Sequence, residues 1–428
     1  MRENALCAFL AGTATATMAW LGLYGFVWSD YDEEARPAFD ALTHGHVAEF
    51  LRLAPAYGGS LVERAPFALM PSLWGGGELA VYRTVAIPCL LAAAALSVWL
   101  VAQMRSQGRT PLARAVTLGL CVANPVTLYA LEIGHPEELL GACLCVAAVL
   151  LASREKWLGA GVLLGLAIAN KEWALLALGP VLLALPAKRR PACVASASGV
   201  AAAVLGPLVL VGSGGFAAGT KAFASASGEI FQPWQLWWFF GTPNHVAAPS
   251  GASPAVPIGA ALSTHPHWRI APTWISGVPH PLILAVGLGL AGAVWLQRRR
   301  RIGTGTLGER EAMLLLALTM LLRCLLDDWD VMYYLLPFLF ALLAWEARGP
   351  SLRPPVLALS STALAWLSFQ WLPEHTSPDA QAAFFLAWTL PLVGLLGLAL
   401  FKPAALVERD KRLGQAREPL GPVLAHQR

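Results

Sequence analysis

Charged residues are scarce in this sequence. Asp, Glu, Lys and Arg make up only 13% of its 428 residues, whereas 57% are hydrophobic, and the mean hydropathy is +0.57. Soluble domains of this length rarely have such a composition, because they need a polar surface over their apolar core. The composition is therefore that of a membrane protein rather than of a water-soluble one.

Two kinds of motif are also missing. There is no G-x-x-x-x-G-K-[ST] loop and no G-x-G-x-x-G between a strand and a helix, which argues against an ATP-driven pump. The seven cysteines lie in apolar runs without metal-ligand spacing, so we interpret them as small core residues. We expect no metal and no other cofactor, and the formal charge of +4 is no evidence for a nucleic acid partner.

Long apolar runs recur along the chain. A helix needs about 17–25 such residues to cross the roughly 30 Å core of a bilayer. The runs predict an all-α, polytopic transmembrane bundle of about twelve spans, formed by a single domain over 1–401 and followed by a tail over 402–428. The expected spans cover roughly 5–27, 80–104, 112–130, 138–152, 158–170, 173–187, 191–212, 280–297, 309–327, 331–347, 355–372 and 380–401. The first span is expected to be retained, because no small-residue cleavage site precedes a soluble domain.

The basic residues predict the orientation of these spans. Most of the 30 Lys and Arg residues fall between spans on one side, as in Lys188-Arg189-Arg190 and Arg298 to Arg301. The positive-inside rule then puts both termini in the cytoplasm of a multi-pass plasma-membrane protein. Two long loops, 28–79 and 213–279, would face outward, and residues 38–53 suit an interfacial helix.

An acidic stretch follows the first span directly. It contains Asp30, Asp32, Glu33 and Glu34. A carboxylate at a low-dielectric boundary can act as a general base toward a hydroxyl group. The alternative is a solvated helix end that only stops membrane insertion.

Two further outer segments place charged residues beside apolar runs. In Gly134-His135-Pro136-Glu137-Glu138, the histidine can bind phosphate or relay a proton, although the acids also suit a capped helix start. In Asn170-Lys171-Glu172, a lysine breaks the positive-inside pattern. Lys171 therefore needs a partner such as Glu172 or a lipid phosphate.

Arg323 lies inside an apolar run, where an ionisable residue is a functional candidate. Alternatively, Arg323 pairs with Asp327, four residues later, and the pair has only a structural role. Asp327, Asp328 and Asp330 cannot all face one point on a regular helix, which argues against a metal site. The Trp-rich segment around Trp237 suits either stacking on a sugar or a place in the membrane interface.

Taken together, these segments resemble the GT-C superfamily of membrane glycosyltransferases. The most similar family is glycosyltransferase family 87, which includes polyprenyl-phosphate-mannose-dependent mannosyltransferase relatives. The similarity covers about 5–346 and rests on Ser29-Asp30-Tyr31-Asp32-Glu33-Glu34-Ala35, Pro55-Ala56-Tyr57-Gly58-Gly59-Ser60, Ala65-Pro66-Phe67, Gly134-His135-Pro136-Glu137-Glu138, Gly165-Leu166-Ala167-Ile168-Ala169-Asn170-Lys171, Asp327-Asp328-Trp329-Asp330 and Tyr333-Tyr334.

The resemblance implies roles for individual residues. A first-loop acid would deprotonate the acceptor hydroxyl, and its position after the first span favours Asp30, then Asp32, with Glu34 as a further candidate. The phosphate of a polyprenyl-phosphate sugar would be held by Lys171 and His135, then Arg64 and Arg323. Further substrate contacts are expected from Glu137, Tyr57, Trp237, Asp328 and Tyr333.

The resulting hypothesis is a transferase that moves a sugar, with mannose expected, to a glycolipid or glycan of the cell envelope at the outer face. Its partners would be the lipid-linked donor, the lipid or glycan acceptor and membrane lipids. Two other classes stay open from the sequence: a transporter or lipid flippase, and a non-catalytic membrane protein of envelope assembly. Loss of sugar transfer on replacing Asp30 and Asp32 by Asn would distinguish the enzyme from the last of these.

Overall fold

Helices form nearly all of the computed structural model, which describes residues 2–24, 30–212, 230–243, 268–275, 277–303, 305–349 and 353–402. Most of the predicted second outer loop, 213–279, and nearly all of the tail, 402–428, lie outside these residues. The elements up to residue 211 are α1 (Arg2–Tyr24), η1 (Tyr31–Ala35), α2 (Arg36–Thr43), α3 (Val47–Leu53), α4 (Gly58–Ala68), η2 (Met70–Trp74), α5 (Glu78–Ser106), α6 (Pro111–Val122), α7 (Pro125–Ile133), α8 (Pro136–Ala152), α9 (Trp157–Asn170), η3 (Glu172–Ala177), α10 (Leu178–Ala184), η4 (Ala187–Arg189) and α11 (Arg190–Val211).

The remaining elements include a very small sheet. They are β1 (Ile230–Phe231), η5 (Trp238–Phe240), β2 (Thr242–Pro243), β3 (Arg269–Ile270), α14 (Pro279–Ile302), α15 (Glu309–Leu326), η6 (Met332–Leu335), α16 (Leu336–Ala347), α17 (Val356–Trp366), η7 (Leu367–Trp371), α18 (Leu372–His375) and α19 (Pro378–Phe401). The strands pair antiparallel in the order β1-β3-β2, with Ile270 opposite both Ile230 and Thr242. The all-α prediction therefore holds apart from three two-residue strands.

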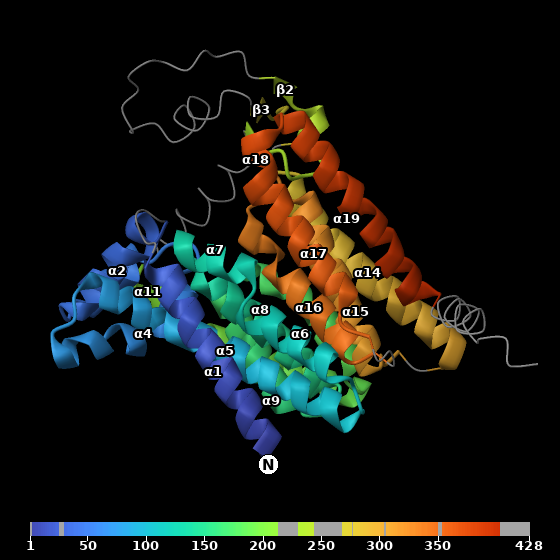
Figure 1. Cartoon of the computed structure of the whole chain (residues 1–428), viewed down its shortest axis with the longest axis horizontal. Helices are drawn as coiled ribbons and strands as arrows, with labels where there is room; N and C mark the ends of the chain where they lie inside the picture. Colours follow the sequence, from blue (N-terminus) through green and yellow to red (C-terminus); the bar gives the residue numbers. More distant parts are fainter. Residues whose placement is uncertain are drawn as a thin grey trace, which may run out of the picture.

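Three helices form the centre of the molecule. α8, α15 and α16 are buried along most of their length, and α16 packs against both of the others (Figure 1). A helix that is apolar on all sides is suited to such a position. The longer helices α5, α11, α14 and α19 leave much of their apolar surface exposed, as expected for helices that face lipid.

Within the described residues, five helical segments are long and apolar enough to cross a membrane by length and composition. They are Glu78–Ser106, Pro111–Ile133, Ala187–Val211, Pro279–Arg301 and Pro378–Phe401. The count of twelve spans is not confirmed. Several expected spans are short or interrupted, because 3-10 segments such as η3 and η6 replace their first turns.

The predicted interfacial helix over 38–53 is instead two helices, α2 and α3. Gly45 separates them with φ +84, a left-handed conformation that favours glycine. Phe39 of α2 and Phe50 of α3 are both buried. They pack with Leu61 of α4 in a hydrophobic cluster of the first loop. This cluster holds η1, and with it the acidic stretch, against the helical bundle through the contact of Tyr31 with Tyr82 of α5.

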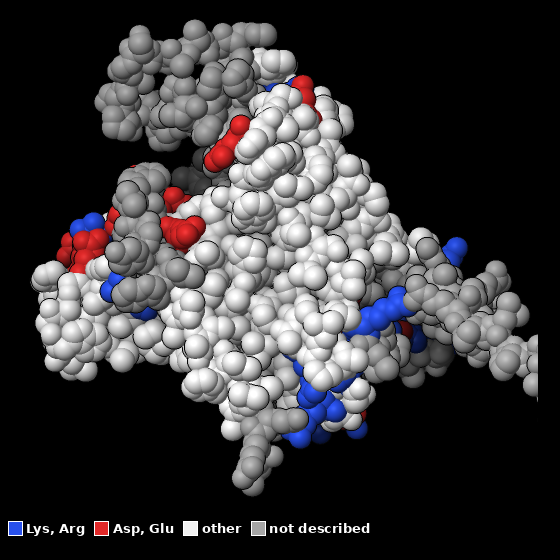
Figure 2. Space-filling view, in the orientation of Figure 1, with Lys and Arg blue, Asp and Glu red and all other residues white. Residues whose placement is uncertain are grey.

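Charged residues gather at opposite ends of the molecule. Figure 2 shows Lys and Arg mainly at the lower right, over the lower ends of α9, α14 and α15, and Asp and Glu at the upper left, over the first loop and near α7. The exposed basic residues at the helix ends between spans include Arg105, Arg154, Lys156, Lys188, Arg189, Arg299, Arg300 and Arg301. Such a separation is typical of a membrane protein with one basic face.

Candidate active site

Five local features, each a helix end, a turn or a 3-10 segment, lie together at the end of the molecule opposite the basic residues. Because successive helices run up and down the bundle, this end contains the α7–α8 turn, the end of α9, the start of α14, the end of α15 and η6. The first loop adds η1 to the same end, where Asp30 contacts the α7–α8 turn. Polar side chains from distant parts of the sequence therefore meet here.

The α7–α8 turn is very short. Asn124 begins α7 by accepting a hydrogen bond from the backbone N–H of Val126 at 2.9 Å. Gly134, at φ +112, ends α7, and Pro136 occupies the first turn of α8. His135 is the one residue between them, so its ring is held over the start of α8.

Glu137 is the centre of a buried charge cluster. Its side chain is fully buried. Oε1 lies 2.7 Å from His135 Nδ1 and 3.4 Å from Lys171 Nζ, and Oε2 lies 3.2 Å from a guanidinium nitrogen of Arg64. The amide of Asn170 donates to the Glu137 backbone carbonyl at 2.9 Å. Three cations from separate elements thus offset the cost of burying this carboxylate.

His135 joins Glu137 to the first-loop acid. Its Nε2 lies 3.1 Å from Asp30 Oδ2, while Nδ1 faces Glu137. Both ring nitrogens must donate in this arrangement, so the ring is a cation. Burial alone would lower the pKa of His135, but Coulombic attraction to Glu137 and hydrogen bonds to Asp30 and Glu137 outweigh it and raise the pKa to about 9. The Tyr333 ring packs against the imidazole, with 4.7 Å between the two ring centroids.

Lys171 follows the last residue of α9 in an extended conformation. Its ammonium lies 3.4 Å from both Glu137 Oε1 and Glu138 Oε1, and 4.0 Å from the centroid of the Tyr57 ring. The Tyr57 hydroxyl donates to Glu34 Oε2 at 2.6 Å. Glu34 is therefore connected to the same cluster through Tyr57.

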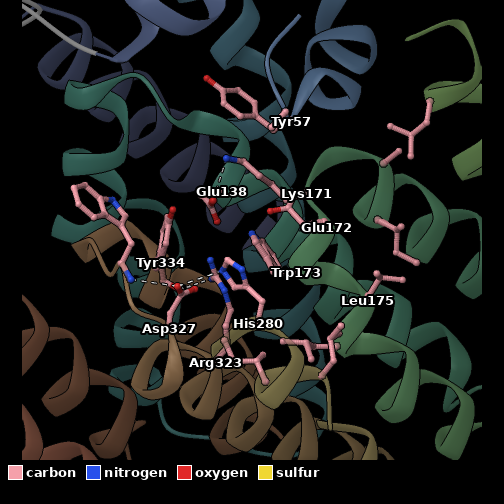
Figure 3. A pocket seen from close by; sticks show the side chains of 18 residues that line it. Tyr57, Glu138, Lys171, Glu172, Trp173, Leu175, His280, Arg323, Asp327 and Tyr334 are labelled. Atoms are coloured by element: carbon pink, nitrogen blue, oxygen red, sulfur yellow. Dashed lines mark hydrogen bonds and ion pairs between the residues drawn. The ribbon is translucent and has the colours of Figure 1, made fainter. Parts of the chain in front are cut away.

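A cavity of about 390 Å³ opens beside Lys171 (Figure 3). One part is polar and contains Lys171, Glu138, Arg323, His280 and Asp327. The other part is apolar and is lined by Ile168, Leu175, Leu176, Leu205, Ile283 and Leu284. Because Leu175 is 43% exposed and Leu284 44% exposed, the apolar wall extends to the outer surface of the helical bundle.

Arg323 lies at the polar end of the cavity between two aromatic rings. Its guanidinium is 4.4 Å from the centroid of Tyr334 and 5.3 Å from that of Trp173, and it donates to the Tyr334 carbonyl at 3.3 Å. His280 Nε2 lies 3.6 Å from Asp327 Oδ1. Asp327 follows the last residue of α15, and the same Oδ1 accepts from the backbone N–H of Trp329.

Two buried polar atoms of the cavity lining lack a hydrogen-bond partner among the described residues. They are Oε2 of Glu138 and Nε1 of Trp173. Buried donors and acceptors are normally satisfied, so these atoms favour a polar ligand in the cavity. A phosphate would accept from the indole N–H and from the neighbouring Lys171 and Arg323.

Potential metal ligands also meet in one place in the described part of the chain. His280, Asp327 and Asp328 bring ligand atoms within 4.8 Å of one another. Asp330, which the sequence placed beside them, is not part of this group. Asp327 contacts His280 and accepts a hydrogen bond from the backbone of Trp329. The expectation that no metal binds stays a prediction.

Other predicted residues lie away from the cavity. Asp32 faces Arg36 at 3.4 Å rather than His135. Arg64 is buried against Glu137 and does not line the cavity. Trp237 donates to the Leu326 carbonyl at 2.8 Å and packs at the end of α15.

Three cavity residues escaped the sequence analysis as ligands. Trp173 and His280 line the cavity, and Glu138 was noticed only as a residue of a helix start. His280 follows Pro279 in the first turn of a long apolar helix, a position that could have marked it as a polar residue at an outer helix end. Its proximity to Asp327 depends on the packing of α14 against α15.

A comparison with family models agrees with this geometry. The model of glycosyltransferase family 87 matches residues 59–324, more than half of the chain. The chain belongs to glycosyltransferase family 87. The match begins after Asp30 and includes His135, Glu137, Lys171 and Arg323. A comparison with curated proteins found no match.

Membership of glycosyltransferase family 87 means that the protein is a membrane glycosyltransferase, and its apolar helices agree with that assignment. A glycosyltransferase needs a sugar donor and an acceptor. The cavity beside Lys171 is where the described residues offer both a cationic and an apolar lining to such a donor.

Proposed function

We propose that this family 87 protein transfers a sugar from a polyprenyl-phosphate donor to an acceptor hydroxyl at the outer face of the plasma membrane. The observation on which the proposal depends is the cavity, which joins a polar end to an apolar wall open at Leu175 and Leu284. A sugar joined through phosphate to a long isoprenoid chain has the same two kinds of surface. Mannose is the expected sugar, and a cell-envelope glycolipid or glycan is the expected acceptor.

The cationic groups of the cavity would bind the donor phosphate. Lys171 and Arg323 carry fixed positive charges, and His280 and the Trp173 indole add N–H donors. Donors held in a partly dry site stabilise negative charge as it develops on a leaving group. His135 and Arg64 would act on this site through Glu137.

Asp30 would serve as the general base. Its side chain is 37% exposed, so an acceptor hydroxyl can approach the carboxylate while His135 holds it. In the reaction, Asp30 takes the proton of the acceptor hydroxyl and the acceptor oxygen forms a bond to the anomeric carbon of the sugar. The bond from that carbon to the phosphate oxygen breaks, and its electron pair leaves with the polyprenyl phosphate.

The distribution of charge supports the proposed orientation. Most exposed basic residues lie at the end of the molecule opposite the acidic first loop (Figure 2), and by the positive-inside rule this distribution favours an extracytoplasmic first loop and cytoplasmic termini. A lipid-linked donor suits this side, because it is delivered within the membrane.

The proposal is tested with the purified full-length protein in lipid vesicles, given radiolabelled polyprenyl-phosphate mannose and a membrane-lipid acceptor extract. The parent should form a labelled product, and Asp30→Asn should lower kcat by about 10²–10⁴-fold. Asp40→Asn is the matched control, because Asp40 lies in the same loop and faces Arg36 at 3.5 Å.

Each result has a distinct meaning. Equal transfer by the parent and Asp30→Asn would discard Asp30 as the base and keep the reaction class. No transfer by the parent from mannose, glucose or arabinose donors would count against the proposed function as a whole.

A further inference from the structure

Glu137 has an unusual position relative to the proposed site. Its side chain is fully buried and is not part of the cavity lining. It nevertheless contacts Arg64 of α4, His135 before α8 and Lys171 after α9. A residue outside the cavity lining thus connects three elements.

Two of these cations belong to different halves of the reaction. His135 holds Asp30, the proposed base for the acceptor. Lys171 lines the cavity for the donor phosphate. Both contact the same carboxylate oxygen of Glu137, Oε1, at 2.7 and 3.4 Å. A movement of this one oxygen would displace both cations.

We propose that Glu137 is a positioning residue that sets the base on the acceptor side and the phosphate-binding lysine on the donor side together. The inference rests on the proposed function, since it assigns both neighbours their roles from it. It adds that one buried carboxylate couples the two half-sites.

The charges around His135 explain how this coupling would appear. Asp30 and Glu137 face its two ring nitrogens, Lys171 repels its charge, and the rings of Tyr57 and Tyr333 lie beside it. If Glu137 loses its charge, burial and Lys171 oppose a cationic His135, with Asp30 alone favouring it. His135 should then lose its proton at a lower pH and hold Asp30 less strongly, because the hydrogen bond between them loses its charge.

Lys171 would also be affected. It would keep Glu138 at 3.4 Å but lose the negative charge of its other carboxylate partner, Glu137. A lysine attracted mainly by Glu138, which itself lines the cavity, would be drawn toward that carboxylate and away from a donor phosphate. Donor binding should therefore weaken at the same time.

The test is Glu137→Gln, which keeps the shape of the side chain and removes its charge. Two quantities are measured: the pH dependence of kcat/KM, and the affinity for radiolabelled polyprenyl phosphate. We expect the alkaline limb of the pH profile to move down by about one pH unit or more. We expect the dissociation constant for polyprenyl phosphate to rise about tenfold.

Glu309→Gln is the control for loss of a carboxylate. Glu309 pairs with Arg348 and begins α15, at the opposite end of that helix from Asp327 of the cavity, and its replacement should change neither quantity. Glu137→Asp keeps the charge and should retain the parent's alkaline limb more closely than Glu137→Gln. If Glu137→Gln does not fold, Glu137→Asp serves as the test variant instead. Its binding of polyprenyl phosphate is then measured and should be weaker than that of the parent.

A purely structural role would lower the amount of folded protein without moving the pH profile or the dissociation constant of the folded fraction. An unchanged pH profile and dissociation constant in folded Glu137→Gln would overturn the inference. If only Glu137→Asp folds, an unchanged dissociation constant for polyprenyl phosphate would overturn it. Failure of the proposed function is seen separately, as absence of transfer by the parent.

Discussion

Five charged side chains alternate in sign through the site, from Asp30 to His135, Glu137 and then Lys171 with Arg64. A buried charge without a partner is costly, whereas breaking one member of such a series leaves its neighbours uncompensated. The series therefore explains how a predominantly apolar protein can keep five ionisable groups close together at one end.

Stability should depend on pH through His135. Its folded pKa of about 9 lies above the ordinary value of 6.5, so its contribution is fully present below about pH 6.5 and is lost as pH rises through 9. Glu63, on α4, acts in the same direction for a different reason: burial raises its pKa to about 8, so stability falls as pH rises. The His135 contribution corresponds to about 3 kcal/mol.

Thermal unfolding of the purified protein at several pH values measures this dependence. We expect the melting temperature to fall between pH 6.5 and 9, and His135→Gln to remove most of the part above pH 8. A melting temperature that stays constant across this range would contradict the cationic state of His135.

Arg323→Met should affect donor binding rather than proton transfer. It removes a cation of the cavity while keeping an apolar side chain between Trp173 and Tyr334. We expect the KM for the donor to rise by at least about tenfold, because a charge-assisted hydrogen bond contributes about 1.5–3 kcal/mol. The pH profile should stay that of the parent.

Initial rates at varied donor concentration measure this effect. Arg269→Met is a suitable control, because Arg269 pairs with Asp379 outside the cavity. A variant whose kcat falls with unchanged donor KM would argue against contact between Arg323 and the donor.

At the scale of elements, α9 and α11 form a close helix pair that determines where Lys171 lies. Gly161 and Gly165 of α9 face the backbone of α11, in a small-residue spacing typical of membrane helix contacts. A Cβ atom on Gly165 would lie 2.5 Å from the Ala197 carbonyl oxygen, which is part of the backbone and cannot move alone. α9 therefore approaches α11 only because these positions are glycine.

Gly165→Ala should separate the two helices and destabilise the protein by about 1–3 kcal/mol, as is usual for overpacking. Since α9 ends one residue before Lys171, polyprenyl phosphate binding should weaken too. Thermal unfolding and lipid binding measure the two effects.

Gly199→Ala is the matched control, because a Cβ atom at Gly199 of α11 meets no atom within 4 Å. It should leave both quantities unchanged or slightly raise stability, since Ala favours helix more than Gly does. Equal effects of the two substitutions would show that the close approach of α9 and α11 is unimportant.

At the scale of the whole molecule, the separation of charge predicts which end faces the cytoplasm. His44, in the first loop, and Lys188, between α10 and α11, are both exposed. In intact cells, a membrane-impermeant maleimide should label His44→Cys and should label Lys188→Cys only after the cells are opened.

The native cysteines interfere little with this experiment, because six are buried and Cys7 is half-buried. The unsubstituted protein gives the background. Labelling of Lys188→Cys but not His44→Cys in intact cells would reverse the orientation and put the cavity on the cytoplasmic side.

Some features followed directly from local sequence. The all-α class follows from apolar runs, because a bilayer leaves no water to satisfy an open backbone and helices satisfy it internally. The start of α8 was visible too, since Pro136, Glu137 and Glu138 suit the first turn of a helix. The number of spans stays unconfirmed, because 3-10 segments such as η3 and η6 interrupt apolar runs without any change in composition.

The sequence alone determined that this is a helical membrane protein, and its resemblance to glycosyltransferase family 87 agrees with the family match. It also indicated Lys171 as a residue that needs a partner, because a charge beside an apolar run is costly, and His135 as a residue that can bind phosphate or relay a proton. Tertiary structure decided which partners they have. Asp30 rather than Asp32 meets His135, Arg64 lies against Glu137, and His280 approaches Asp327. These contacts join residues from different helices, and only the packing of those helices brings them within hydrogen-bond distance or close to it.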